Sequence, residues 1–123
     1  MNRSLPFALA ALIMTATALA GTVTPAEVAR QIQDPKTAPF LLDVRTAEEF
    51  AEGHVPGAKN IPVKDLQAQM AAVPKDRPVV VYCHVGGRAA LASSLLRERG
   101  YTNVSEMQGS MTAWEAQKLP VEK

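Results

Sequence analysis

The sequence predicts a single α/β domain with a mainly parallel sheet, because short apolar runs alternate with segments of helical periodicity. The most apolar run, "PVVVYC" at residues 78–83, is rich in β-branched residues and does not alternate with polar ones. This pattern is typical of a strand that is buried on both faces of a parallel sheet. No internal repeat or low-complexity linker divides residues 21–123, so we expect one domain there.

The first half of the domain is expected to hold three helices and two strands. In "TPAEVARQI", Thr24 precedes Pro25, and Glu27 follows three residues after Thr24, which is the capping-box signature of a helix start. Thr46 is expected to cap a second, short helix. The remaining segments are a strand at 40–44, a turn rich in Gly and Pro at 53–58, a short strand at 59–63 and a helix at 63–73.

The second half is expected to continue from the buried strand with two more helices and one more strand. The segment at 88–100 predicts a helix that has an apolar face opposite a charged face and that ends at Gly100. "NVSEMQG" predicts a last short strand. "SMTAWEAQKL" predicts a last helix, with Ser110 as its cap and Trp114 in the core.

The first 20 residues have the features of a cleaved export signal. They begin with a cationic end, continue with an apolar stretch rich in Ala and Thr, and close with Ala18-Leu19-Ala20, the small-x-small pattern that signal peptidase recognises. The alternative is a membrane anchor, which needs about 20 strongly apolar residues. We expect cleavage after Ala20, a mature domain of residues 21–123 that is not embedded in the membrane, and an exported, periplasmic location.

The charges of the chain narrow the class of partner. There are 13 basic and 12 acidic residues, and Arg3 is the one charged side chain among residues 1–20, so residues 21–123 carry 12 of each sign. No cluster of lysine or arginine is present, which argues against a nucleic-acid or anionic-membrane partner. We expect the partner to be a small molecule or a protein.

Cys83 is the only cysteine of the chain, and it is the last residue of the most apolar run. A single cysteine in an exported chain is an inert buried thiol, an intermolecular disulfide partner or a free reactive thiol. In open parallel sheets, ligands bind outside the carboxyl ends of the strands. Asp43 and Arg45 lie at the end of a second strand-like run, so the sequence predicts polar or reactive groups at two strand ends.

The loop "CHVGGR" is suited to binding an anion. None of the five residues after Cys83 is proline, so each keeps its backbone N–H, and Gly86 and Gly87 can take positive φ. Such amides can form an anion-binding nest, to which the following helix adds the positive end of its dipole and Arg88 a full charge. All three effects favour a thiolate at Cys83, a nucleophile that needs no histidine base. His84 is expected at the rim, and a Cys–His pair is the alternative.

Two longer segments carry several motifs in a fixed order. "LLDVRTAEEFAEGHVPGAKNIPV" contains Asp-x-Arg, Glu-Phe and Gly-His-x-Pro-Gly-Ala. "VVVYCHVGGRAALASSLLRERGYTNVSEMQGSMTAW" contains Cys-x-x-Gly-x-Arg, the following helix, Gly-Tyr-x-Asn-Val and Gly-x-x-x-x-Trp. Together they resemble the rhodanese family of sulfurtransferases, in its small exported form. The resemblance implies a doubly wound sheet of five parallel strands flanked by helices.

The resemblance also implies a chemistry and a role for each loop residue. The Cys83 thiolate would take a sulfur atom from a donor such as thiosulfate, and the persulfide would pass that sulfur to cyanide or a thiol. The cradle would be formed by His84, Val85, Gly86 and Gly87, with Arg88 closing it and binding anionic donors. Asp43 and Arg45 would order the neighbouring strand end, and His54 would fix its turn. No cofactor is implied, and one cysteine with two histidines cannot supply a structural zinc site.

The length of the loop separates related activities. From Cys83 to Arg88 is six residues, the length found in sulfurtransferases, whereas related phosphatases and arsenate reductases have one residue more. A phosphatase is therefore the weaker enzyme hypothesis, and a persulfide carrier or thiol-interaction module for a protein partner is the non-enzyme alternative. The sequence departs from the family at Ala89, where serine is frequent, and at Ser110, where glycine is usual, and both changes bear on donor preference.

Overall fold

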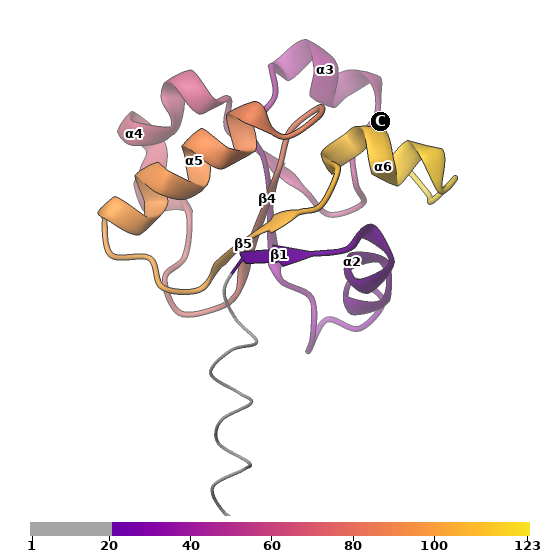
Figure 1. The fold of residues 1–123 in the computed structure, drawn as a ribbon, viewed down its shortest axis with the longest axis horizontal. Coiled ribbons are helices and arrows are strands. Elements are labelled where there is room, and N and C mark those ends of the chain that lie inside the picture. Colours follow the sequence, from indigo (N-terminus) through magenta and orange to yellow (C-terminus); the bar gives the residue numbers. More distant parts are fainter. Residues whose placement is uncertain (1–20) are drawn as a thin grey trace, which may run out of the picture.

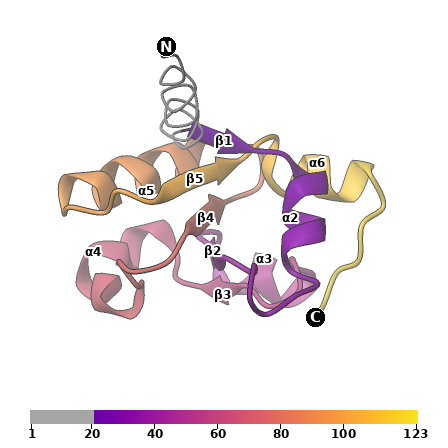
Figure 2. The same ribbon diagram turned by 90° about the horizontal axis from the view of Figure 1, so that it is seen from below.

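The structure, a computed structural model, describes residues 21–123, and the predicted export signal lies outside the described residues. Its core is a sheet in which β5 lies beside β1 (Figure 1), and the five strands follow the order β1-β5-β4-β2-β3 (Figure 2), with every neighbouring pair parallel. The strands are β1 (Gly21–Val23), β2 (Phe40–Asp43), β3 (Lys59–Asn60), β4 (Val79–Tyr82) and β5 (Val104–Met107). The predicted α/β class and parallel sheet are confirmed.

Helices cover both faces of the sheet, as the doubly wound prediction requires. Figure 2 shows α4 and α5 on one side and α2 and α6 on the other. The helices are α2 (Pro25–Gln31), α3 (Ala47–Glu52), α4 (Leu66–Gln69), α5 (Gly87–Glu98) and α6 (Ser110–Ala116). None of the helices within residues 21–123 is long and apolar enough to cross a membrane.

The core consists of two apolar clusters, one on each face of the sheet. Successive residues of a strand point to opposite faces. In β4, Val79 and Val81 therefore pack toward α4 and α5, whereas Val80 and Tyr82 pack toward α2 and α6. Both sets are buried, which explains why the run shows no alternation. Trp114 of α6 is fully buried in the second cluster, as expected.

Two of the three capping residues predicted from the sequence are confirmed, and the third is wrong. Thr24 and Thr46 each close a capping box, with Glu27 and Glu49 respectively. The predicted cap at Ser110 is wrong: Gly109 is the N-cap, in the left-handed conformation, and Ser110 is the first helical residue. A Cβ on Gly109 would lie 2.5 Å from the Cβ of Ala113, so glycine is needed there.

The predicted helix at 63–73 is shorter than expected. The structure divides it into the 3₁₀ turn Val63–Asp65, α4 and the 3₁₀ turn Met70–Ala72. Of the four apolar residues at helical spacing in this segment, Leu66, Met70 and Val73 are buried and Val63 is partly buried.

The parallel register brings two polar strand ends together. Asp43 of β2 is paired with Tyr82 of β4, and the Val44 amide donates to the Tyr82 carbonyl at 3.1 Å. Arg45 follows Asp43 by two positions, and Cys83 follows Tyr82 directly. The two strand ends singled out in the sequence are therefore neighbours at the carboxyl edge of the sheet.

Candidate active site

Cys83 is held at the point where β4 turns into α5. The residue is 1 % exposed and is a free thiol. Two backbone amides donate to its sulfur, from Gly86 at 3.1 Å and from Ala89 at 3.4 Å. Because Ala89 lies in the first turn of α5, the positive end of the helix dipole also faces the sulfur. The arrangement can stabilise a negative charge on Sγ.

The loop residues predicted to form the cradle differ in their contacts with the free Cys83 thiol. Gly86 donates its backbone N–H to the sulfur. Within residues 21–123, His84, Val85 and Gly87 make no hydrogen bond to Sγ. Gly86 has φ 142°, the conformation that lets its amide turn inward, but Gly87 already begins the helix. His84 is exposed, as expected for a rim residue, and Val85 is 64 % exposed at the loop tip.

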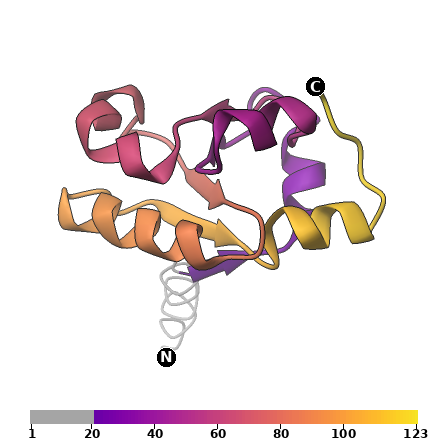
Figure 3. The ribbon, with the colours of Figure 1, turned by 90° about the horizontal axis from the view of Figure 1, so that it is seen from above.

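The start of α6 forms the other wall of the cradle. Figure 3 shows the turn from β4 into α5 lying against the start of α6. The Cys83 amide donates to Ser110 Oγ at 3.1 Å, and that oxygen lies 4.0 Å from the cysteine sulfur. The amides of Met111 and Thr112 donate to the carbonyls of Cys83 and His84, each at 3.0 Å. The loop is thus fixed from both sides.

Two contacts of the sulfur were missed at the level of sequence. The sequence marks Ala89 and Ser110 as departures from the family pattern and Ser110 also as a helix cap, but it assigns neither residue a contact with the sulfur. Yet the Ala89 amide donates to Sγ, and the Ser110 hydroxyl lies beside it. A main-chain donor leaves no trace in residue type, so only the position of Ala89 in the first turn of the helix could have indicated it.

Arg88 is engaged by a carboxylate. Its Nη1 and Nη2 atoms donate to the two Glu49 oxygens at 2.8 and 3.2 Å. The hydrogen bonds from Arg88 lower the pKa of Glu49 to about 2, and the same pair raises the pKa of Arg88. The side chains are 36 % and 32 % exposed, so both remain accessible from solvent. Arg88 thus lies in the first turn of α5 with its charge balanced by a carboxylate of α3.

Asp43 and Arg45 form a buried ion pair beside this site. Arg45 Nη2 lies 2.7 Å from Asp43 Oδ2 and 2.8 Å from the Gly53 carbonyl oxygen, to which it also donates. The side chains are 6 % and 0 % exposed for Arg45 and Asp43. Burial acts to lower the pKa of Arg45, but the hydrogen bonds and charge of Asp43 outweigh it and raise that pKa. The pair ties the end of β2 to the turn that contains His54, whose Nδ1 hydrogen-bonds to the Phe50 carbonyl at 2.8 Å.

A small cleft of about 200 Å³ opens beside the loop, between α3 and α6. Three carboxylates, from Glu49, Glu52 and Glu115, share its lining with Arg45 and His84. Within residues 21–123 no three His, Cys, Asp or Glu side chains gather in a way that could hold a metal ion.

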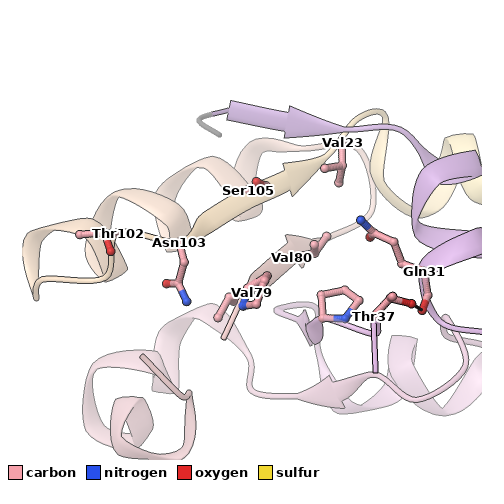
Figure 4. Close-up of a pocket in the computed structure, with 10 residues that line it drawn as sticks. Val23, Gln31, Thr37, Val79, Val80, Thr102, Asn103 and Ser105 are labelled. Atoms are coloured by element: carbon pink, nitrogen blue, oxygen red, sulfur yellow. Dashed lines mark hydrogen bonds between the residues drawn. The ribbon is translucent and has the colours of Figure 1, made fainter. Parts of the chain in front are cut away.

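A second pocket, of about 350 Å³, lies at the opposite edge of the sheet (Figure 4). Its lining includes residues at or just before the amino ends of β2, β4 and β5, among them Pro39, Val79 and Asn103. It is remote along β4 from Cys83, which follows the other end of that strand. A functional site chosen by pocket size alone would therefore be placed at this pocket and not at Cys83.

The fold and the cradle define the class: a doubly wound α/β domain that holds a cysteine between a strand end and a helix start. Residues 24–117 match the family described as Rhodanese-like domain, and the chain belongs to that family. A sulfurtransferase of Allochromatium vinosum is 38 % identical over 82 residues, which are 67 % of this chain and 77 % of that protein.

Two further comparisons agree with this assignment. Thiosulfate sulfurtransferase PspE of Escherichia coli is 43 % identical over 70 residues, which cover 55 % of this chain and 67 % of PspE. The crystal structure of a rhodanese-related protein from Thermoplasma volcanium superposes with a TM-score of 0.75 at 26 % identity, covering 84 % of this chain and 98 % of that one. Sulfur transfer is thus the activity common to the named enzymes among these relatives.

Proposed function

We propose that the chain is a sulfurtransferase that moves a sulfane sulfur from a donor such as thiosulfate to cyanide or a thiol through a persulfide on Cys83. The single observation that carries the proposal is the pair of main-chain donors on the Cys83 sulfur, at 3.1 and 3.4 Å, at the start of a helix. These donors favour the thiolate and require no base. The sulfurtransferase relatives support sulfur transfer in general.

The reaction has two half-reactions at one sulfur atom. In loading, the Cys83 thiolate attacks the outer sulfur of thiosulfate, the S–S bond of the donor breaks, and sulfite leaves with the electron pair. The product is a persulfide whose terminal sulfur carries the negative charge. In discharge, cyanide or a thiolate attacks the terminal sulfur, the Sγ–S bond breaks, and the Cys83 thiolate is regenerated. No external oxidant or reductant is needed.

Arg88 has a role in the first half-reaction under this proposal. An anionic donor competes with Glu49 for the guanidinium, which the ion pair at 2.8 Å holds beside the loop. The carboxylates of the neighbouring cleft repel such a donor. Recognition of thiosulfate therefore depends on how readily Glu49 releases Arg88.

The decisive experiment is intact mass spectrometry of the mature protein after treatment with thiosulfate, beside Cys83→Ser. Wild type is expected to gain the mass of one sulfur atom and to lose it on addition of cyanide, whereas Cys83→Ser gains nothing. Absence of uptake from thiosulfate, polysulfide and mercaptopyruvate would refute sulfur transfer. Cys83-dependent hydrolysis of an aryl phosphate would instead identify a phosphatase.

A persulfide carrier for a protein thiol is the second candidate. It is favoured by Val85, an apolar side chain that is 64 % exposed at the tip of the loop. Slow turnover with small acceptors, together with a mixed disulfide that forms with one protein and requires Cys83, would favour the carrier over the enzyme.

The proposed setting is the periplasm, after removal of residues 1–20. The support is the sequence alone: an apolar stretch that ends in Ala18-Leu19-Ala20. Amino-terminal sequencing of protein from the envelope fraction tests it. A mature chain that begins at Gly21 is expected, and a retained Met1 in the membrane would indicate an anchor.

A further inference from the structure

Ser110 occupies a conformation that its residue type disfavours. Its φ is 51°, in the left-handed region where a side chain is strained and glycine is not. The residue is 1 % exposed and is the first residue of α6. A serine at this position therefore carries a conformational cost that glycine does not, unless its side chain makes a compensating contact.

The hydroxyl of Ser110 makes that contact with Cys83. Ser110 Oγ accepts the Cys83 N–H at 3.1 Å, which leaves its own hydrogen free to donate. The Cys83 sulfur, 4.0 Å away, is the other hydrogen-bond partner of this hydroxyl among the described residues. The distance is at the outer limit for a sulfur acceptor, and hydrogen bonds in a resting site often shorten as charge develops on the acceptor.

We infer that the Ser110 hydroxyl is a third donor to the Cys83 sulfur and that it acts chiefly in discharge, when Sγ is the leaving group. The inference rests on the proposed sulfur transfer. The two amide donors come from the α5 side, whereas Ser110 comes from α6, so the sulfur is held from both walls.

The two half-reactions should respond differently to the loss of this donor. During discharge the Sγ–S bond breaks and Sγ gains the electron pair, so a donor to Sγ lowers the barrier. During loading Sγ gives up its charge to the donor molecule, and a stabilised thiolate is a weaker nucleophile. Removing the hydroxyl therefore slows discharge, while loading at alkaline pH, where the thiolate is already formed, is little changed.

The experiment compares Ser110→Ala and Ser110→Gly with wild type in single turnovers. Both variants lose the hydroxyl, but only glycine also relieves the strained φ. We expect discharge by cyanide to slow by about five- to tenfold in both, with loading by thiosulfate at alkaline pH within about twofold of wild type. The thiolate absorbance at 240 nm should appear at higher pH in both variants. Ser93→Ala is the matched control, because its hydroxyl is also buried, in α5, but donates to the Ala89 carbonyl at 3.0 Å.

Each outcome is decisive for the donor role. Wild-type discharge rates in both variants overturn it, and so does a slow Ser110→Ala beside a normal Ser110→Gly, which would assign the effect to the backbone. If wild type takes up no sulfur, the proposed function fails. The thiolate titration then still tests the hydroxyl: a shift to higher pH in both variants supports the donor, and an unchanged titration overturns it.

Discussion

The ends of β2 and β4 lie side by side, and both carry buried polar groups, yet they differ in how those groups are satisfied. After β2, the Asp43 carboxylate meets the Arg45 guanidinium at 2.7 Å, so the two charges balance each other. After β4, the hydrogen-bond partners of the Cys83 sulfur among the described residues are all donors, from Gly86, Ala89 and Ser110. The charges of the ion pair neutralise each other, whereas hydrogen-bond donors around a sulfur stabilise a negative charge on it.

Arg88 and Glu49 connect the two strand ends. Glu49 belongs to α3, which follows β2, and Arg88 belongs to the first turn of α5, after the loop that follows β4. Glu49 also accepts the amide of Thr46 at 3.0 Å in the capping box of α3. The Glu49 carboxylate therefore caps α3 after β2 and also balances the charge of Arg88 after β4.

The largest expected contrast is between Asp43→Ala and Cys83→Ala. Asp43→Ala leaves Arg45 buried without its partner, which should lower the free energy of unfolding by about 3–5 kcal/mol. Cys83→Ala removes a buried thiol and should change stability by about 1 kcal/mol, but it should abolish sulfur uptake. Urea unfolding and intact mass spectrometry, applied to both variants, measure the two effects.

The contrast fails if the two effects are exchanged. A folded, stable Asp43→Ala that has lost sulfur uptake would place the ion pair in the chemistry. A Cys83→Ala protein that unfolds as readily as Asp43→Ala would make the cysteine a structural residue.

The second prediction concerns Gly109, which sets the position of α6 against the cysteine loop. Gly109→Ala introduces a Cβ that would lie 2.5 Å from the Cβ of Ala113, at φ 75°. Strain and overlap together should cost about 2–3 kcal/mol of unfolding free energy. The start of α6 should shift, and sulfur uptake should slow with it.

Gly57→Ala is the control for this change. Gly57 has φ 86°, but a Cβ there meets nothing within 4 Å. Its variant should lose only the cost of the disfavoured φ, about 1 kcal/mol, and should keep wild-type uptake. If both variants lose the same unfolding free energy, the overlap with the Ala113 Cβ contributes nothing to the effect of Gly109→Ala.

Most of the fold was accessible from the sequence, because its signals are local. Capping boxes at Thr24 and Thr46 involve residues three positions apart, and the buried run at 78–83 needs only its composition. The segment at 63–73 was predicted less well. Its spacing fixed the buried face correctly, but spacing alone does not distinguish a continuous α-helix from short helical turns.

The site was accessible in outline and not in its contacts. The order of strand, Cys83, glycines and helix predicts a cradle of amides, and in the structure the amides of Gly86 and Ala89 donate to the Cys83 sulfur. The contacts of Ser110 and Glu49 with the loop join residues 27 and 39 positions apart in the chain. Such pairs depend on how α3 and α6 pack, which a single sequence does not encode in any local pattern.

The third prediction tests the link between the two strand ends through Glu49→Gln. Glutamine can still complete the capping box of α3 but carries no charge to hold Arg88. The loss of stability should be below about 1 kcal/mol, because the pair is partly exposed. The KM for thiosulfate should fall about two- to fivefold, since the Arg88 charge is no longer balanced.

Glu48→Gln controls for the change in net charge, because Glu48 is the exposed neighbour of Glu49 in the same turn of α3. Its variant should retain the wild-type KM. If both variants lower KM alike, the effect belongs to the general field of α3 and not to the release of Arg88.

The smallest expected effect is the pH dependence of the same ion pair. Its hydrogen bonds lower the pKa of Glu49 from 4.5 to about 2 in the folded protein. Between these values the unfolded chain binds a proton that the folded protein does not, so the stabilisation by Glu49 is present above pH 4.5 and is lost as the pH falls toward 2. The difference in unfolding free energy between wild type and Glu49→Gln should therefore be constant at neutral pH and shrink below pH 4.5. Urea unfolding of both proteins at each pH measures it, and a difference that stays constant down to pH 2 would contradict the ion pair and, with it, the link between the two strand ends.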